Sequence, residues 1–400
     1  MCQILQFNST ELQDLTLSFT IMNITSIILK VSSICNLNCK YCYLFNKSDK
    51  SHLTFSNIMP HEVVVATLEK IDEYLRNTNT HSVELTFLGG EPLIAGIDFY
   101  KEFFSLAEKY IQNGDIKYSI QTNGTLLNSE WLSLFKSHGV CIGVSLDGDE
   151  EANKDRITKS GNPAFGQTIN GIKLALSQGM DIGVLSVIPV STNPVTYYSF
   201  FKELGIKYLD CLIQDATYET YNSGNRGFGL WLCQLYDIWI NDKNRISIRT
   251  FESIIRLLCN PHLKIGGEIL GNSENGVIDI TPNGDITIPD TMLICGNRLI
   301  QQNINVKTNS LTDIFNEPIY QLYYDSHKEH SLAHKCRNCC IKSICGGGML
   351  AHRFSQNRGF DNPSVYCFDL FLLIKHIQND LVSRLKDSSI EPLTIQDFNI

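Results

Sequence analysis

Residues 24–43, ITSIILKVSSICNLNCKYCY, join an apolar run to a loop that carries three cysteines. The apolar run is rich in β-branched residues and predicts a strand. Cys35, Cys39 and Cys42 follow it at close spacing, which brings several thiolates to one metal centre without the closure of a long loop. The first predicted strand therefore presents a candidate metal-binding loop at its C-terminal end.

Further apolar runs follow this strand, and helix-like segments separate them. Such βα units, spaced roughly 30 residues apart, predict a parallel sheet with helices outside it. Six units are too few for a closed eight-stranded barrel, so we expect an α/β fold with an open, partial (β/α)6 barrel. The strands are expected at 24–31, 83–87, 116–120, 140–146, 182–188 and 208–213, and the helices at 62–75, 99–111, 129–137, 168–178 and 195–204.

The rest of the chain has a different character, with turn residues, clustered cysteines and little predicted regular structure. Pro282-Asn283-Gly284 marks the turn of a hairpin, and a last helix is expected near 369–385. We therefore predict a small cysteine-rich domain after the barrel. The expected divisions are an N-terminal extension at 1–24, the barrel at 25–245, a bridging segment at 246–264 and the cysteine-rich domain at 265–400.

Composition narrows the functional class. The formal net charge is −9 and no dense Lys/Arg run occurs, which argues against a nucleic-acid-binding protein. No apolar stretch reaches the length of a membrane span, and the N-terminus lacks the pattern of a secretory signal. We expect a cytoplasmic protein with no membrane partner, in which the 14 cysteines are not paired as disulfides.

Short motifs stand at the ends of successive predicted strands. Gly89-Gly90-Glu91-Pro92 follows the second strand, Asn123 the third and Ser145 the fourth, with Arg156 in the next loop. In parallel α/β sheets the chemistry lies at the C-terminal ends of the strands. Taken one by one, these residues could equally form turns, and Arg156 a solvated ion pair.

The cysteine loop, with an aromatic residue before its third cysteine, and the GGEP motif together resemble the radical S-adenosylmethionine (SAM) superfamily. The resemblance implies a [4Fe–4S] cluster on Cys35, Cys39 and Cys42, one iron of which binds SAM. Three unrelated cysteines, or a zinc site that lacks a ligand, are the alternatives. The residues implied in SAM binding are Tyr41, Gly89, Gly90, Glu91, Asn123, Ser145, Arg156 and Asp215.

A second group of cysteines resembles the SPASM domain of radical SAM peptide maturases. The resemblance implies an auxiliary [4Fe–4S] cluster, for which a four-thiolate zinc site is the alternative; its ligands would be Cys336, Cys339, Cys345 and Cys367. Pro289 and Met349 stand where a further cluster would need cysteines, so we expect that cluster to be absent. Cys259, Cys295 and Cys340 would then be buried thiols or thiols beside a cluster.

The stretch 345–367 resembles maturases that form three-residue cyclophanes in ribosomal peptides. The resemblance predicts Cβ hydrogen abstraction from a precursor peptide and a crosslink to an aromatic ring, with a flavodoxin or ferredoxin as electron donor. Asp290 is the expected base, and a turn or capping residue is the alternative. An anaerobic sulfatase-maturase-like oxidase of a serine or cysteine side chain, and a non-catalytic iron–sulfur or zinc protein that binds a peptide, are the competing functions.

Overall fold

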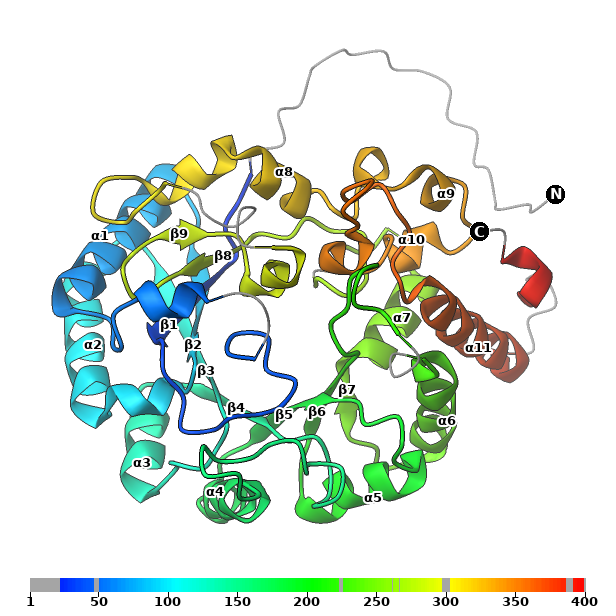
Figure 1. The fold of residues 1–400 in the computed structure, drawn as a ribbon, viewed down its shortest axis with the longest axis horizontal. Coiled ribbons are helices and arrows are strands. Elements are labelled where there is room, and N and C mark those ends of the chain that lie inside the picture. The colour runs from blue at the N-terminus through cyan, green and yellow to red at the C-terminus, as the bar shows by residue number, and fades with distance from the viewer. Residues whose placement is uncertain are drawn as a thin grey trace.

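A computed structural model describes residues 22–46, 50–222, 226–260, 262–265, 267–296, 303–385 and 391–398. Most of the predicted N-terminal extension lies outside these residues. The described chain forms one sheet with helices around it and a region of short helices beside it (Figure 1). Among the described residues, no helix is both long and apolar enough to cross a membrane.

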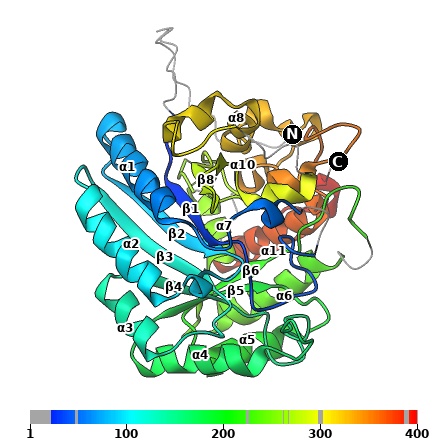
Figure 2. The same ribbon diagram turned by 60° about the vertical axis from the view of Figure 1, so that its left-hand side comes forward.

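Six parallel strands, each followed by a helix, form the open barrel that the sequence predicts. Neighbours in sequence are neighbours in the sheet, and Figures 1 and 2 show the helices outside the strands. The strands are β1 (Ser26–Ser32), β2 (Ser82–Gly89), β3 (Asp115–Thr122), β4 (Cys141–Ser145), β5 (Ile182–Val187) and β6 (Tyr208–Leu212), and the helices are α1 (His61–Thr78), α2 (Ile97–Tyr110), α3 (Ser129–Ser137), α4 (Phe165–Ser177), α5 (Pro194–Leu204) and α6 (Phe228–Asn241).

The sheet continues beyond these six strands on both sides. The short strand β7 (Ser247–Ile248) pairs with β6. At the other side β8 (Val277–Ile280) pairs in parallel with β1, and β9 (Ile286–Thr287) returns antiparallel to β8. The hairpin predicted for the cysteine-rich domain is therefore an extension of the barrel sheet. The predicted domain divisions stay a prediction, and the hydrogen-bonded sheet runs across them.

Local sequence signals explain several helix ends. The Asn128 side chain accepts the first free backbone N–H groups of α3, and Asn193 does the same for α5, which has a proline in its first turn. Both are standard ways to begin a helix. Gly205 ends α5 in the left-handed conformation, which costs a glycine little.

Two helices, α6 and α7 (Arg249–Cys259), are not foreseen in the sequence. Helix α6 packs against α11 (Cys367–Leu385), and the two approach closely because Gly229 has no side chain. A Cβ there would lie 2.7 Å from the Asp369 backbone, whereas the Gly229 N–H donates to the Asp369 carboxylate over 2.7 Å. This contact holds the start of α11 against the barrel helices.

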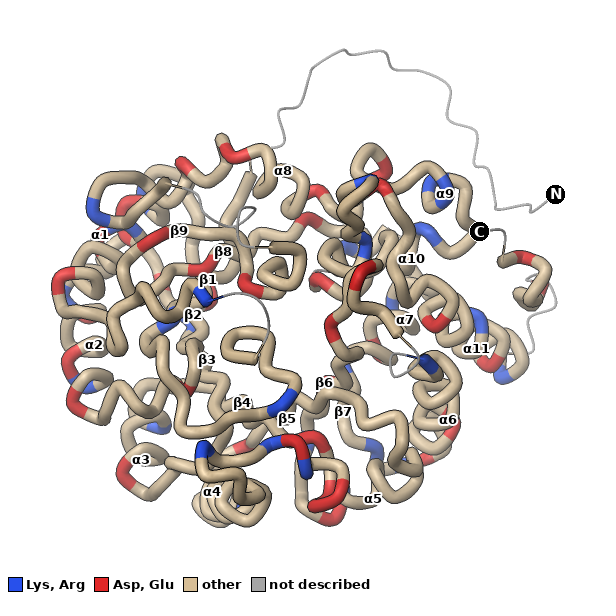
Figure 3. The backbone as a smooth tube through the Cα atoms, in the orientation of Figure 1, with Lys and Arg blue, Asp and Glu red and all other residues tan. Residues whose placement is uncertain are grey.

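The cysteine-rich region contains only short helices before α11. They are α8 (Pro318–Tyr324), α9 (His334–Arg337) and α10 (Lys342–Cys345), with 3-10 turns at Asp290–Cys295 and Leu350–Arg353. Acidic and basic residues are interspersed around the coloured part of the chain in Figure 3.

Candidate active site

The cysteine loop leaves β1 and lies against the segment that follows β4. The Asn38 N–H donates to Ile157 O over 2.7 Å, and the Lys40 N–H to Asp155 O over 3.0 Å. These backbone bonds fix the loop across the C-terminal ends of the strands. The thiols of Cys35, Cys39 and Cys42 (the loop cysteines) are half-buried and all free of disulfides.

The glycine pair after β2 lies against the start of this loop. The Gly90 N–H donates to Ser32 O over 2.8 Å, and a Cβ on Gly90 would lie 2.3 Å from Ile34 O. The glycines therefore permit close approach of the protein's own backbone to the residues that precede Cys35. A larger residue at this position would displace the cysteine loop.

Glu91 holds two strand ends together. Its side chain is fully buried, and the carboxylate accepts hydrogen bonds from Leu93 N at 3.1 Å, Thr122 Oγ1 at 2.7 Å and Asn123 N at 2.7 Å. Both oxygens are engaged, so the Glu91 side chain positions the loops rather than offering an open acceptor to a ligand. SAM contact by its side chain stays a prediction without support from this geometry.

Asn123 and Ser145 lie at the ends of β3 and β4. Asn123 Nδ2 donates to Asn36 Oδ1 over 2.8 Å and lies 3.9 Å from the Cys35 sulfur. Ser145 Oγ accepts from Gln121 Nε2 over 2.8 Å. Asn123 thus lies beside the cysteine loop. Ser145, at the end of β4, contacts the neighbouring strand β3.

Arg156 is buried rather than solvated, with 7% of its surface exposed. Its Nη1 donates to the Tyr41 hydroxyl over 2.8 Å, and that hydroxyl hydrogen-bonds to the Asp147 carboxylate. The alternative of a solvated ion pair is therefore wrong. The Arg156 Nε is buried without a partner among the described residues, which leaves one guanidinium donor for a carboxylate such as that of SAM.

Asp215 lies beyond the end of β6, and His352 Nε2 is 3.2 Å from its Oδ1. Its charge also reaches Tyr43, whose hydroxyl pKa is raised first by burial and then by nearby carboxylates that include Asp215. Asp215 is thus on the same side of the barrel as the cysteine loop. Its predicted contact with SAM stays a prediction.

The C-terminal cysteines come from α9, α10 and the start of α11. Cys336 and Cys345 are buried, and Cys339 and Cys367 are half-buried. Burial raises the pKa of Cys345 to about 12, and the neighbouring Cys336 and Cys339 thiols add to the shift. The four thiols therefore lie within electrostatic reach of one another, although the chain between them is mostly irregular.

Within the described chain, no three Cys, His, Asp or Glu side chains converge as they would around one metal ion. In a tetrahedral zinc site all sulfurs lie about 2.3 Å from one ion. In a four-iron cluster each thiolate binds a different iron, so its sulfurs stand further apart.

The three remaining thiols differ in their surroundings. Cys295 is buried, with its sulfur 3.7 Å from Ala351 O. Cys259 and Cys340 are exposed, at a helix end and in a surface turn. They are therefore not buried thiols, and a place beside a cluster stays a prediction for them. Met349 packs against the core as a partly buried residue.

Asp290 lies at the mouth of the barrel and is 3% exposed. Its Oδ1 accepts a hydrogen bond from the Tyr43 hydroxyl over 3.0 Å, and its Oδ2 lies 3.2 Å from the Lys30 ammonium. Asp290 is the first residue of a 3-10 turn whose N-cap position is taken by Pro289. The alternative of a turn residue fits this place in the chain, and the role of Asp290 as a base stays a prediction.

Lys30 links the Asp290 carboxylate to the strands of the barrel. It projects from β1 to Asp279 of β8, 2.9 Å away, as well as to Asp290. Tyr43 directly follows the third loop cysteine, and the negative charge of Asp290 reaches the Cys42 thiol. The carboxylate of Asp290 is thus buried, held in place from two sides and close to the loop cysteines. Lys30 and Tyr43 were not singled out in the sequence, although a lysine within an apolar strand is a signal.

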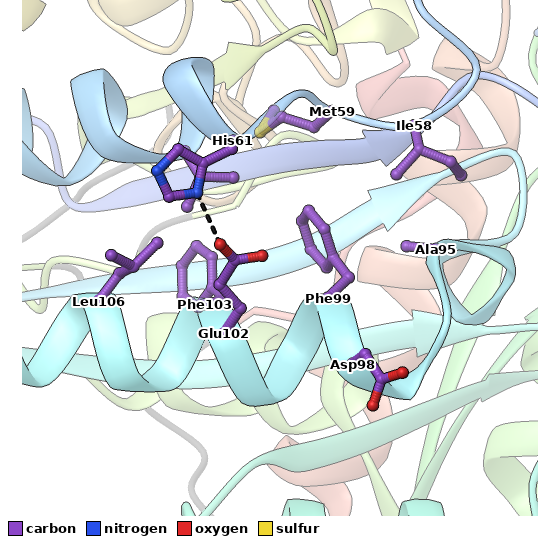
Figure 4. A pocket seen from close by; sticks show the side chains of 10 residues that line it. Ile58, Met59, His61, Ala95, Asp98, Phe99, Glu102, Phe103 and Leu106 are labelled. Carbon is purple, nitrogen blue, oxygen red and sulfur yellow. Dashed lines mark hydrogen bonds and ion pairs between the residues drawn. The ribbon is translucent and has the colours of Figure 1, made fainter.

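Two cavities lie near or on the barrel. One of about 350 Å³ is bordered by the glycine pair, Lys30 and Thr287, and its size suits a small ligand or side chain. The other, about 260 Å³, lies between α1 and α2 and contains the His61–Glu102 pair, 2.6 Å apart (Figure 4). The second cavity contains none of the predicted site residues.

Residues 29–219 match the model of the radical SAM superfamily. This part of the chain is similar to that superfamily, and the match agrees with SAM and [4Fe–4S] clusters as the cofactors. The α/β partial barrel predicted from the βα pattern is confirmed.

Curated relatives extend the match over most of the chain. A cysteine-type anaerobic sulfatase-maturating enzyme of Clostridium novyi is 26% identical over 86% of this chain and 92% of its own length. A serine-type anaerobic sulfatase-maturating enzyme of Bacteroides thetaiotaomicron is 27% identical over 87% of each chain. The similarity to sulfatase-maturating enzymes contradicts the prediction of cyclophane formation.

Solved structures show the same fold. The native anSMEcpe structure with bound AdoMet has a TM-score of 0.78 at 23% identity and covers 90% of this chain and 99% of that one. Streptococcus suis SuiB bound to precursor peptide SuiA has a TM-score of 0.60 at 19% identity, with 86% and 76% coverage. At these identities the likeness concerns the fold alone.

Part of the stretch 345–367 has a structural role. The carbonyl groups of its glycines accept hydrogen bonds from the buried Arg353. A motif with such a role does not by itself specify the bond that an enzyme makes in its substrate.

Proposed function

We propose that this protein is an anaerobic oxidase that converts the Cβ of a serine or cysteine side chain in a peptide or protein substrate into an aldehyde. The observation that carries this proposal is the buried Asp290 carboxylate beside the cysteine loop, held by Tyr43 and Lys30. The extended similarity to serine-type and cysteine-type sulfatase-maturating enzymes supports it.

We place one [4Fe–4S] cluster and SAM at the loop cysteines and a second cluster at Cys336, Cys339, Cys345 and Cys367. Two observations of the chain fit these groups. The Arg156 Nε is a buried donor without a partner in the described chain, and the thiols within each cysteine group lie within electrostatic reach of one another. When bound, SAM and its cluster supply a 5′-deoxyadenosyl radical that can take a hydrogen atom from an unactivated carbon.

The chain's own residues must then handle a proton. Oxidation of a CH₂–OH or CH₂–SH group to the C=O or C=S level removes one hydrogen atom from carbon, one proton from the heteroatom and one electron. Asp290 is the proton acceptor in our proposal, since an ionised carboxylate within hydrogen-bond reach can act as a general base. The electron passes to a redox partner such as a flavodoxin or ferredoxin, and water replaces sulfur where the substrate is a cysteine.

Lys30 and Tyr43 prepare Asp290 for this role. The ammonium favours the ionised carboxylate by charge, and the tyrosine hydroxyl orients it by a hydrogen bond to Oδ1. Because Asp279 shares the same ammonium, the charge on Lys30 does not fully neutralise Asp290. The arrangement holds a buried carboxylate in a fixed position next to the cysteine loop.

A matched set of synthetic peptides tests the proposal. Anaerobically reconstituted enzyme is incubated with SAM, a reductant and peptides that differ only in a central serine, cysteine or alanine. We expect product from the serine peptide lighter by two hydrogen atoms, or product from the cysteine peptide that has lost two hydrogen atoms and carries oxygen in place of sulfur, and none from the alanine peptide. An alanine peptide that is modified as readily would contradict side-chain oxidation.

A further inference from the structure

Arg353 is a buried cation that lacks an acidic partner. It is 0% exposed and one of the largest fully buried side chains described. In the described part of the chain, no carboxylate forms an ion pair with it. An isolated buried charge is expensive, and such groups are normally paired or sit beside a metal centre.

Backbone carbonyls surround its guanidinium. Nε donates to Gly347 O over 3.0 Å, and Nη2 donates to Gly346 O and Gly348 O over 2.7 Å each. Nη1 donates to Ser326 O over 2.8 Å. The hydrogen-bond donors are therefore largely satisfied, whereas the positive charge has no counter-charge in these contacts.

The glycine carbonyls point at the guanidinium because three successive residues adopt left-handed backbone conformations. Gly346, Gly347 and Gly348 have φ of 57°, 80° and 70°. A Cβ on Gly347 would lie 2.7 Å from Arg353 Nη2. The run directly follows Cys345, so the same turn that cages the cation also places a thiol of the auxiliary site.

The charge of Arg353 lies close to the cysteines of that site. Its Nη2 hydrogen-bonds to the carbonyl of Gly346, the residue that directly follows Cys345, and Arg353 interacts electrostatically with the Cys336 and Cys345 thiols. Its field also acts on His327, whose pKa falls to about 4 through burial and then through Arg353. Little solvent screens the charge here.

We propose that Arg353 is the built-in counter-charge for an anionic iron–sulfur cluster held by Cys336, Cys339, Cys345 and Cys367, and that it raises the reduction potential of this cluster. Four thiolates give such a cluster a net negative charge, which increases on reduction. A fixed nearby cation stabilises the more negative, reduced form, because net charge and local electrostatics set these potentials. The inference rests on the cluster position proposed above, but not on which side chain the enzyme oxidises.

The first test compares Arg353→Met, which removes the charge, with Arg353→Lys, which keeps it but loses the planar set of donors. Redox titrations of reconstituted holoprotein followed by EPR give the potential of the auxiliary cluster in each. We expect a shift to more negative potential in Arg353→Met and a much smaller shift in Arg353→Lys. Equal potentials in wild type and Arg353→Met would overturn the proposal.

A second test measures thermal stability in place of reduction potential. In the background in which all four cysteines are alanine, Arg353 has no counter-charge. We expect Arg353→Met to raise the melting temperature in that background and to lower it in the loaded wild type. Destabilisation of the same size in both backgrounds would show that Arg353 serves only as a hydrogen-bond hub, contrary to the proposal.

Iron counting keeps the two proposals apart. If the four-alanine variant retains as much iron as wild type, the cluster position itself is wrong. If it loses the iron but Arg353→Met leaves the potential unchanged, the cluster position stands and the role of Arg353 falls.

Discussion

Lys30 and Arg353 are two buried cations in this molecule, and their partners differ in kind. Lys30 lies between the carboxylates of Asp279 and Asp290, 2.9 and 3.2 Å away. Within the described residues, Arg353 hydrogen-bonds to backbone carbonyls, and thiols rather than carboxylates lie within reach of its charge. The first cation is balanced by the polypeptide alone, and the second is balanced only when the cysteines are ionised.

The difference separates two kinds of site. At the barrel mouth the Lys30 ammonium has its carboxylate partners before any cofactor binds. A site that prepares a general base requires such an arrangement. In the cysteine-rich region the negative charge of the proposed cluster offsets the positive charge of Arg353. Metal binding there is therefore coupled to folding. Changes at the two sites should therefore have different consequences, which the following predictions address.

Removing either cysteine group should give the largest effects. We expect about eight irons per reconstituted wild-type chain and about four when either group is replaced by alanine. Loss of the loop cysteines should abolish 5′-deoxyadenosine release while the other cluster persists. Iron analysis with Mössbauer spectroscopy measures both, and about twelve irons in the wild type would contradict the absence of a further cluster near Pro289 and Met349.

Asp290→Asn removes the proposed base and keeps its shape. Because the amide cannot accept the substrate proton, we expect product formation to fall by roughly 10²- to 10⁴-fold, the usual contribution of a general base. Release of 5′-deoxyadenosine should continue, so the ratio of product to 5′-deoxyadenosine reports the defect. Asp98→Asn, on the surface of α2, is the matched control, and an unchanged ratio in Asp290→Asn would remove this residue from the mechanism.

Lys30→Met tests the balanced cation. It leaves two buried carboxylates without their ammonium, so we expect the free energy of unfolding to fall by about 3–5 kcal/mol. The triple variant Lys30→Met, Asp279→Asn, Asp290→Asn should recover much of this stability, because no charge is then left unpaired. Denaturant unfolding measures both proteins, and a triple variant no more stable than Lys30→Met would contradict the pairing.

Glu268 should give the smallest effect, on the pH dependence of stability. Burial, and then the charges of Asp290 and Asp215, raise the pKa of Glu268 to about 7, despite a hydrogen bond from Tyr323. Its unfolded value is about 4.3, so the folded state holds the proton more tightly. The contribution of Glu268 is thus present at low pH and is lost as pH rises from about 4 through 7. Melting temperatures should fall over this window in wild type relative to Glu268→Gln, and parallel curves for the two proteins would refute the shift.

Much of the barrel could be predicted because each strand carries its own signal. The runs around Val83 and Ile116 predict β2 and β3 to within a few residues, and Ser129–Ser137 matches α3 as observed. Helix α6 gave no such signal, since it is apolar on most sides and is defined by its contact with α11. The strand-end motifs likewise predicted which loops surround the cysteines.

The partners of the buried charges could not be predicted. Lys30 and Asp279 meet because β8 pairs with β1, a contact between distant parts of the sequence. The cage around Arg353 depends on glycine conformations that a sequence does not display. The substrate reaction was misassigned because it was predicted from the stretch 345–367, whose glycines form the cage around Arg353, and a structural role of this kind does not specify a substrate.

The most direct test of the central claim is to trap the product of a serine peptide with a hydrazine reagent. Both a crosslink and an aldehyde would make the peptide lighter by two hydrogen atoms, but only the aldehyde forms a hydrazone. We predict a hydrazone at the serine position with wild-type enzyme and none when the loop cysteines are alanine. A product of the same lowered mass that forms no hydrazone, and whose fragments keep an aromatic residue joined to a neighbouring Cβ, would contradict the account.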